Sequence, residues 1–216
     1  MADRDVMLAY PHPGTVRGEF MTRVLAAVHD ENSRIGQLGD LKTGPGIGLA
    51  RNALAKRFLE SDMEWLWMLD SDMVISLNTL PALLEAADPD ERPIMGAMCC
   101  VIAEEQVRAT IYTTGRDDEG AFGFKHIQEP PPNTILRVDG TGCACLLIHR
   151  SVFGRMAAAK PEFAGLWFSE MIVEKHQMGE DLSFCLRCAM AEVPVFVHTG
   201  IEVGHMKSVQ LGNVSP

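Results

Sequence analysis

Residues Trp65–Asp72 read WLWMLDSD, a run of apolar side chains that ends on two carboxylates separated by one serine. A continuous apolar stretch of this length, beginning at Glu64 and ending at Leu69, is typical of a strand buried on both faces of a parallel sheet. Because side chains alternate along an extended chain, Asp70 and Asp72 are expected to point the same way. The stretch therefore predicts a central strand with an acidic site at its carboxyl end.

Two readings of this acidic pair are open on the triplet alone, because so short a pattern often arises by chance. Like charges at that distance repel unless a cation lies between or beside them, and carboxylate oxygens suit Mg or Mn. Such a cation could also hold a diphosphate and neutralise it as it leaves. In the alternative reading, Asp70 ends the strand and Asp72 caps a helix that begins after Ser76.

Apolar periodicity in the first hundred residues alternates between strand and helix. The expected strands are Val6–Tyr10, Glu64–Leu69 and Ile94–Ile102, and the expected helices are Gly18–His29, Leu49–Leu59 and Leu77–Ala87. No strongly apolar second strand is evident between Asp30 and Gly44. This alternation predicts an α/β fold with a mostly parallel central sheet and helices on both faces.

The second half of the chain is less regular. Thr113–Asp139 is rich in glycine, proline and charge, and we expect long loops or a mobile hairpin that shapes a substrate mouth. After it, the pattern predicts strands at Cys143–Ile148 and Val193–Val197 and helices at Arg150–Ala159 and Asp181–Ala191.

Length and composition narrow the class of protein. With 216 residues, 47% of them apolar, the chain is expected to form one domain, residues 1–216. A net charge of -10 lacks the positive potential that draws proteins onto nucleic acid or anionic lipid. No run approaches the roughly 20 apolar residues of a membrane span, and no signal peptide is evident. We therefore expect a cytoplasmic protein.

The six cysteines agree with a reducing compartment, since they sit mostly in apolar runs where a free thiol behaves as a small hydrophobe. Two pairs, Cys143 with Cys145 and Cys185 with Cys188, also have spacings that could serve a zinc site. The same spacings place each pair on one packed face of a strand or helix, which is the favoured interpretation.

Several segments, taken in order, resemble the GT-A glycosyltransferases, particularly the family-2-like branch of bacterial and phage type. They are VMLAYPHPG (6–14), ARNALAKRFL (50–59), WLWMLDSDM (65–73), VDGTGCACLLIHRSVF (138–153) and MGEDLSFCLRCAMAEVPVFVHTGIEVGH (178–205). The resemblance implies a Rossmann-like GT-A domain with a nucleotide-sugar-binding half, residues 1–100, and an acceptor and catalytic half, residues 101–216. It implies a UDP- or GDP-linked donor, Mn²⁺ or Mg²⁺, inversion at the anomeric carbon, and a saccharide, protein or modified nucleobase as acceptor.

The resemblance also implies roles for the acidic triplet and a late histidine. Asp72 would bind the metal directly, and Asp70 would contact the ribose or reach the metal through water. His205 matches a position that often supplies a further metal ligand, and a neutral imidazole suits Mn. Without the family, His205 would be read as a partly exposed histidine in a terminal loop.

Further positions match the donor site of such enzymes. Tyr10 and Pro11 match the loop that packs against the nucleotide base, and Arg51 matches a position near the nucleotide. A cation in a first helical turn is unfavourable unless an anion is close, which favours a phosphate or base contact for Arg51 over an ordinary solvated position. Gly142, in the Gly140–Gly142 segment before a strand, would let donor or acceptor approach the backbone, although a plain tight turn explains it equally well.

Glu180 and Asp181 match the family's ED motif, in which a carboxylate accepts the proton of the attacking acceptor hydroxyl. We assign Asp181 as the base and Glu180 as the residue that orients it, while the reverse assignment stays open. The purely structural reading is that these acids stabilise the start of a helix.

Two rival functions remain. Gly44, Gly46 and Gly48 before a helix, with Asp70 at a strand end, could belong to a dinucleotide-binding oxidoreductase, but their spacing is not G-x-G-x-x-G. A Walker phosphate loop is excluded, because no Gly-Lys-Ser/Thr follows. The other rival is a catalytically dead GT-A module that binds or scaffolds.

Overall fold

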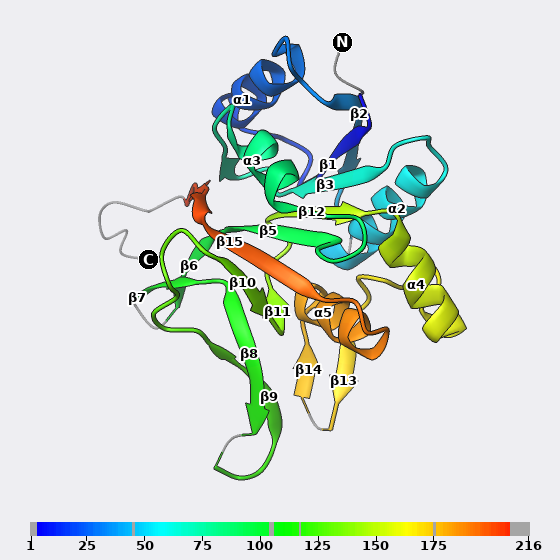
Figure 1. Ribbon diagram of the computed structural model, residues 1–216, viewed down its shortest axis with the longest axis vertical. Coiled ribbons are helices and arrows are strands. Elements are labelled where there is room, and N and C mark those ends of the chain that lie inside the picture. The colour runs from blue at the N-terminus through cyan, green and yellow to red at the C-terminus, as the bar shows by residue number, and fades with distance from the viewer. Residues whose placement is uncertain (1–3, 45, 104–105, 117, 175, 208–216) are drawn as a thin grey trace, which may run out of the picture.

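A seven-stranded sheet forms the centre of the computed structural model, which describes residues 4–44, 46–103, 106–116, 118–174 and 176–207 (Figure 1). The strand order is β10-β15-β5-β12-β3-β1-β2. The bounds are β1 (Val6–His12), β2 (Ile35–Lys42), β3 (Trp65–Leu69), β5 (Ile94–Met98), β10 (Ile135–Val138), β12 (Cys145–His149) and β15 (Val195–Glu202).

The sheet is mixed, so the expectation of a mostly parallel sheet is not confirmed. β1 pairs in parallel with β2 and β3, and β15 pairs in parallel with β5. β12 lies antiparallel between β3 and β5, and β10 is antiparallel to β15. Hairpins rather than a single crossover helix separate β5 from β12 along the chain, and so the direction of β12 is not fixed by a βαβ connection.

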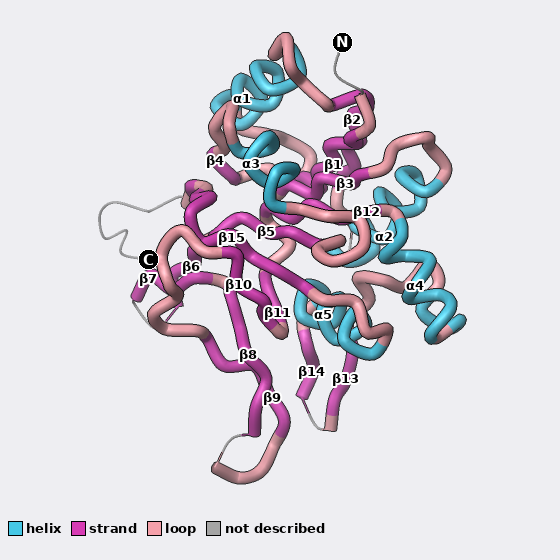
Figure 2. The backbone as a smooth tube through the Cα atoms, viewed as in Figure 1, coloured by secondary structure: helices cyan, strands magenta, loops and turns pink. Residues whose placement is uncertain are grey.

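Helices cover both faces of this sheet, as the alternation in the sequence indicates (Figure 2). They are α1 (Gly18–His29), α2 (Ile47–Leu59), α3 (Thr79–Ala86), α4 (Ser151–Ala159) and α5 (Glu180–Met190). One apolar cluster packs α2, α4 and α5 against the sheet through Leu54, Phe58, Phe153 and Phe184. The other packs α1 and α3 against the opposite face through Phe20, Val24, Leu80 and Leu83.

β2 lies between Asp30 and Gly44, where the sequence shows no strongly apolar strand. It pairs with β1 from Val6 and Ile35 to His12 and Lys42. As an edge strand, β2 buries few of its side chains, and only Ile35 and Gly39 are buried. A strand that buries so little needs no strongly apolar run, which is why apolar periodicity does not reveal it.

Short hairpins account for most of the irregular second half. β6 (Cys100–Ala103) pairs with β7 (Gln106–Ala109), so the run expected as one strand, Ile94–Ile102, divides between β5 and β6. Within the segment expected as loops or a hairpin, β8 (Ile111–Arg116) pairs with β9 (Phe122–His126) and β11 (Gly140–Thr141). The remaining elements are β4 (Met73–Val74), the 3₁₀ helix Pro161–Phe163, β13 (Met171–Val173), β14 (His176–Met178) and β16 (Gly204–His205).

The β8–β9 and β13–β14 hairpins extend from the same end of the molecule, below α5 in Figure 1. In the ranges that the structure describes, no helix is both long and apolar enough to cross a membrane.

Candidate functional site

A pocket of about 280 Å³ opens where the parallel strands β1, β2 and β3 end. Its walls come from the segments that follow these strands: Pro11–Pro13, Thr43–Gly44 with Ile47, and Asp70–Asp72. The Asp70 amide donates to the Ala144 carbonyl at 2.9 Å, and the Met73 amide donates to the Asp70 carbonyl at 3.1 Å. These bonds fix the acidic triplet in a tight turn at the carboxyl edge of the sheet.

Arg51, on α2, links this edge to the start of α5. Its guanidinium is almost fully buried, donates through Nη2 to Asp70 at 2.6 Å and donates through Nη1 to Glu180. Its pKa is raised by both acids against the opposing effect of burial, so the charge is retained. Each terminal nitrogen thus binds one carboxylate, and Arg51 is not among the residues that line the pocket, so the phosphate contact expected from the sequence stays a prediction.

Asp72 pairs with the C-terminal part of the described chain rather than with Arg51. His205 Nε2 lies 3.0 Å from Asp72 Oδ2, and Lys207 Nζ donates to the same oxygen at 3.3 Å. The pairing of β16 with β4 brings these residues together, with His205 opposite Met73. The helix-capping interpretation of Asp72 is wrong, because α3 begins at Thr79 and Asn78 occupies its N-cap position.

His205 has hydrogen-bond acceptors on both sides of its ring. Nδ1 lies 2.9 Å from the Cys100 carbonyl oxygen, and Nε2 faces the Asp72 carboxylate. A neutral imidazole carries one N–H, so it can donate to only one of these acceptors. If Nδ1 carries the proton, Nε2 presents a lone pair beside a carboxylate, which is a donor set that suits a divalent cation. Asp72 and His205 therefore fit a metal, although no group of three or more potential ligands occurs among the described residues.

Asp181 is partly buried at the start of α5, where its Oδ1 accepts a hydrogen bond from the Leu182 amide at 2.7 Å. Burial, followed by the charge of Glu180, raises the pKa of this carboxyl. A β-carbon added at Gly142 would lie 3.7 Å from Asp181 Oδ2, so Gly142 and Asp181 are neighbours. Glu180 differs from Asp181 in its partner, since its carboxylate binds the Arg51 guanidinium.

Tyr10 and Pro11 lie in different surroundings, although the sequence predicts that both contact the nucleotide base. Pro11 lines the pocket, whereas the Tyr10 ring is 9% exposed and packs edge-on against Phe20 at 5.2 Å between ring centroids. Successive side chains of a strand point to opposite faces, which separates the two. The sequence did not point to three residues of this region. His12 and Thr43 line the pocket, and Lys207 contacts Asp72. Of the three, only His12 lies in a segment whose sequence, Pro11–Gly14, predicts a loop after a strand.

All six cysteines are free thiols. Five of them are buried, and Cys100 is only partly buried. Burial raises the pKa of Cys145 and of Cys185 to about 12, so the zinc-binding thiolate form is disfavoured. Gly48, one of the glycines of the dinucleotide reading, serves packing: a β-carbon there would lie 2.3 Å from the Phe168 carbonyl oxygen.

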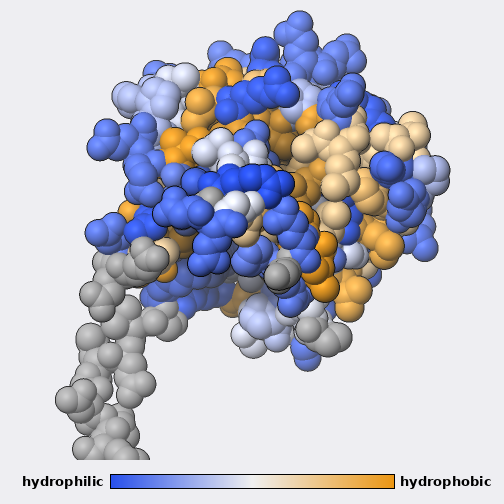
Figure 3. Space-filling view, turned by 90° about the horizontal axis from the view of Figure 1, so that it is seen from below, coloured by the Kyte–Doolittle hydropathy of each residue, from blue (hydrophilic) through white to orange (hydrophobic). Residues whose placement is uncertain are grey.

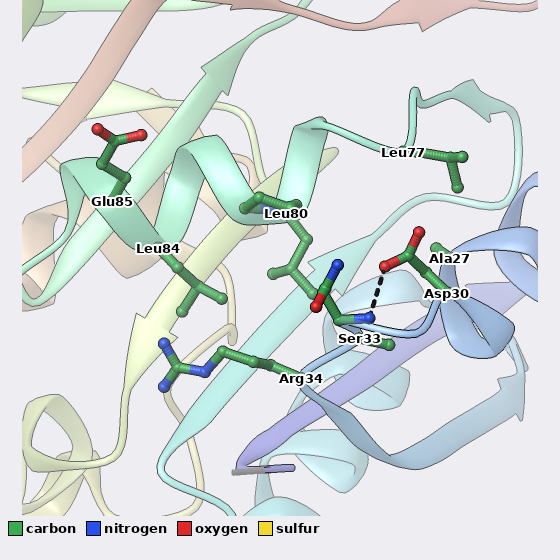
Figure 4. Close-up of a pocket in the computed structure, with 10 residues that line it drawn as sticks. Ala27, Asp30, Ser33, Arg34, Leu77, Leu80, Leu84 and Glu85 are labelled. Carbon is green, nitrogen blue, oxygen red and sulfur yellow. Dashed lines mark hydrogen bonds between the residues drawn. The ribbon is translucent and has the colours of Figure 1, made fainter. Parts of the chain in front are cut away.

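A second hollow of about 340 Å³ lies between α1 and α3 (Figure 4). Leu77, Leu80 and Leu84 supply its apolar wall, and Asp30 and Arg34 lie at its rim. It shares no residue with the pocket at Asp70. Its lining offers no paired acids at strand ends, so the candidate site is the pocket at the carboxyl edge.

Comparison with known proteins shows that this chain resembles solved structures in fold. No protein-family model matches the sequence, and no curated protein matches it. Among solved structures, the chain is similar to A197 from STIV, with 15% identity, a TM-score of 0.58, and coverage of 94% of this chain and 86% of that chain. It is also similar to GalNAc-T7 solved with UDP, GalNAc and Mn²⁺, with 12% identity and a TM-score of 0.63. That match covers 98% of this chain but 45% of GalNAc-T7, so the chain spans under half its length. These likenesses show that the chain has a GT-A-like fold.

Proposed function

We propose that this chain is a glycosyltransferase that transfers a sugar from a nucleoside-diphosphate donor to an acceptor hydroxyl. The proposal rests on the observation that Asp70 and Asp72 line one pocket at the carboxyl edge, while Arg51 joins Asp70 to Glu180 of α5. The likeness to GalNAc-T7, whose structure contains UDP, GalNAc and Mn²⁺, supports a nucleotide-sugar donor. In this proposal residues 1–100 bind the donor, and residues 101–216 hold the acceptor and the base.

Asp72 and His205 are the proposed protein ligands of Mn²⁺ or Mg²⁺, with Asp70 nearby to contact the ribose or a metal-bound water. When bound, the metal would neutralise charge on the diphosphate as it leaves. Such ions are commonly held by one or two carboxylates together with substrate phosphates, so a small protein ligand set is in keeping with this role. Lys207, now on Asp72, would be released to the donor phosphates.

Asp181 is the proposed general base, and Glu180 is a positioning residue. Glu180 is bound to the buried Arg51, which leaves it poorly placed to accept a proton. Asp181 has no cationic partner among its described hydrogen bonds, and burial raises its pKa toward the range in which a carboxylate is an effective base. Gly142 lies beside it, and a β-carbon there would lie 3.3 Å from Thr110 Oγ1 and 3.7 Å from Asp181 Oδ2, so a larger residue would crowd the carboxylate.

The proposed donor is UDP- or GDP-linked, and the proposed reaction inverts the anomeric carbon. Pro11 contacts the base in this scheme, while Tyr10 supports the loop from behind through its contact with Phe20. Direct attack by an acceptor hydroxyl activated at Asp181 needs no covalent sugar–enzyme intermediate, which is consistent with inversion.

Donor hydrolysis and transfer test the proposal. Wild-type protein is incubated with UDP- and GDP-sugars with Mn²⁺ or with EDTA, and released nucleoside diphosphate and product configuration are measured. Metal-dependent release that is lost in Asp72→Ala, with an inverted product, is expected. Release of nucleoside diphosphate that is equal with Mn²⁺ and with EDTA, and equal in wild type and Asp72→Ala, would refute the metal assignment. A product that keeps the configuration of the donor would refute direct displacement.

A further inference from the structure

A separate pocket of about 310 Å³ lies between the β8–β9 and β13–β14 hairpins. Phe122, Gly123 and Phe124 supply one wall, and His176 and Met178 supply the other. These hairpins are additions to the central sheet and contribute no strand to it. The pocket is distinct from the one at Asp70, because the two share no lining residue.

The aromatic rings in this pocket are not core residues. Phe122 and Phe124 alternate along β9 and therefore share one face of the hairpin, where their rings meet edge-on at 6.1 Å between centroids. Both are only partly buried, and neither belongs to the two apolar clusters that pack the sheet. The face of the molecule seen in Figure 3 carries both hydrophilic and hydrophobic residues. Partly exposed rings with nearby polar groups are typical of a small-ligand site.

One wall of the pocket lies against the start of α5. A β-carbon added at Gly140 would lie 2.7 Å from the Phe124 ring and 2.9 Å from the side chain of Leu182, which follows Asp181 in the first turn of α5. Met178, which lines the pocket, is buried just before α5. The pocket therefore adjoins the helix whose first turn carries Asp181.

A bridge between the two hairpins fixes the width of the pocket. Glu174, at the turn between β13 and β14, accepts a hydrogen bond from Arg116 Nη1 at 2.9 Å and from the Phe122 amide at 3.0 Å. Glu174 has a φ of 55°, a left-handed conformation that is unusual for a residue other than glycine. The bridge holds the Phe122 wall against the β13–β14 hairpin.

The geometry points to this pocket as the acceptor site, and we propose that its occupant is a saccharide whose ring lies against Phe122 and Phe124. This inference rests on the proposed glycosyltransferase function. A pyranose has an apolar face for the rings and hydroxyl groups for His176 and the glycine backbone. The volume is at the lower end of ligand pockets, which are roughly 300 to 1,000 Å³, and so suits a sugar unit better than a folded protein surface.

The site can be tested with fluorine NMR on protein labelled with 4-fluorophenylalanine, with the two resonances assigned by Phe122→Leu and Phe124→Leu. Disaccharides of glucose, galactose, mannose and N-acetylglucosamine are titrated, and single-stranded oligo-dT serves as the nucleobase probe. Phe122→Leu also removes one ring of the pocket wall, and the Phe124 resonance then reports binding. Phe163→Leu is the matched control, because Phe163 is another partly buried ring and does not line the pocket.

At least one disaccharide should move both resonances, with affinity weakened about tenfold or more by Phe122→Leu and kept in Phe163→Leu. No movement with any disaccharide, or an affinity that is unchanged in Phe122→Leu, would overturn the proposal. Movement with oligo-dT alone would replace the saccharide by a nucleobase. Binding of UDP or GDP with Mn²⁺ is measured separately, so loss of the acceptor site is distinguishable from failure of the proposed function.

Discussion

Arg51 Nη2 donates to Asp70 Oδ1 at 2.6 Å, although the two residues come from different elements, α2 and the end of β3. The arginine side chain is 3% exposed, and the Asp70 side chain is 24% exposed. Because the same guanidinium also binds Glu180, one buried cation fixes the positions of two acids on opposite sides of the site.

Arg51→Met is expected to destabilise the protein by about 3 to 5 kcal/mol, because removing one partner of a buried ion pair leaves charge uncompensated. Arg51→Lys keeps the charge but lacks the planar fork that reaches two carboxylates, so a smaller loss is expected. Urea unfolding followed by circular dichroism measures both variants. An unchanged unfolding midpoint in Arg51→Met would show that the pairs contribute nothing to stability.

The activity should rise with pH as Asp181 ionises, and the pKa of this carboxyl is raised above its ordinary value of 3.8. The base must be ionised to accept a proton, and burial, followed by the charge of Glu180, favours its neutral form. Glu180→Gln removes the second cause, so the acidic limb of the kcat/KM profile should move to lower pH. Asp181→Asn should lower kcat by about 10²- to 10⁴-fold. An acidic limb that stays in place in Glu180→Gln would contradict the coupling.

The same carboxyl should affect stability with a definite sign. Its folded pKa is raised, so the folded state binds the proton more tightly, and the stabilisation is present below pH 3.8 and lost as pH rises through the raised value. Asp181→Asn should therefore lose less stability than wild type over that window. Denaturant unfolding at several pH values, with Asp118→Asn as an exposed control, measures the difference, and parallel pH curves for wild type and Asp181→Asn would contradict it.

Much of the fold could be predicted because its elements carry local signals. The α1 helix spans the residues expected from apolar spacing, and β3 follows from its unbroken apolar run. β2 was missed because an edge strand buries few side chains, and β13–β14 because its strands are three residues each. The link from Arg51 to Glu180 joins residues 129 apart in sequence, so no local pattern could reveal it.

Gly48→Ala should destabilise the protein by about 1 to 3 kcal/mol, since the new methyl group would meet the Phe168 carbonyl oxygen at 2.3 Å. In an open helix, replacing glycine by alanine would instead be favourable by about 0.5 to 1 kcal/mol. Gly154→Ala is the matched control, because Gly154 lies inside α4 and a β-carbon there meets nothing within 4 Å. Thermal unfolding of the two variants decides the point, and equal midpoints would show that α2 shifts freely.

The native protein should react with a thiol reagent such as DTNB at about one cysteine, Cys100, which is only partly buried. The other thiols are buried, and burial raises their pKa, so they should react only after unfolding. Counting released thionitrobenzoate before and after guanidinium addition gives the two values. Zinc release on labelling would instead revive a metal role for the cysteine pairs.

The donor site is tested most directly by thermal shift with UDP-, GDP-, CMP- and dTDP-linked ligands, each with and without Mn²⁺, for wild type and Asp72→Ala. We expect stabilisation by a UDP- or GDP-linked ligand only when Mn²⁺ is present, and loss of this effect in Asp72→Ala. No shift with any nucleotide, or an equal shift in the variant, would contradict a metal-dependent donor site at Asp72.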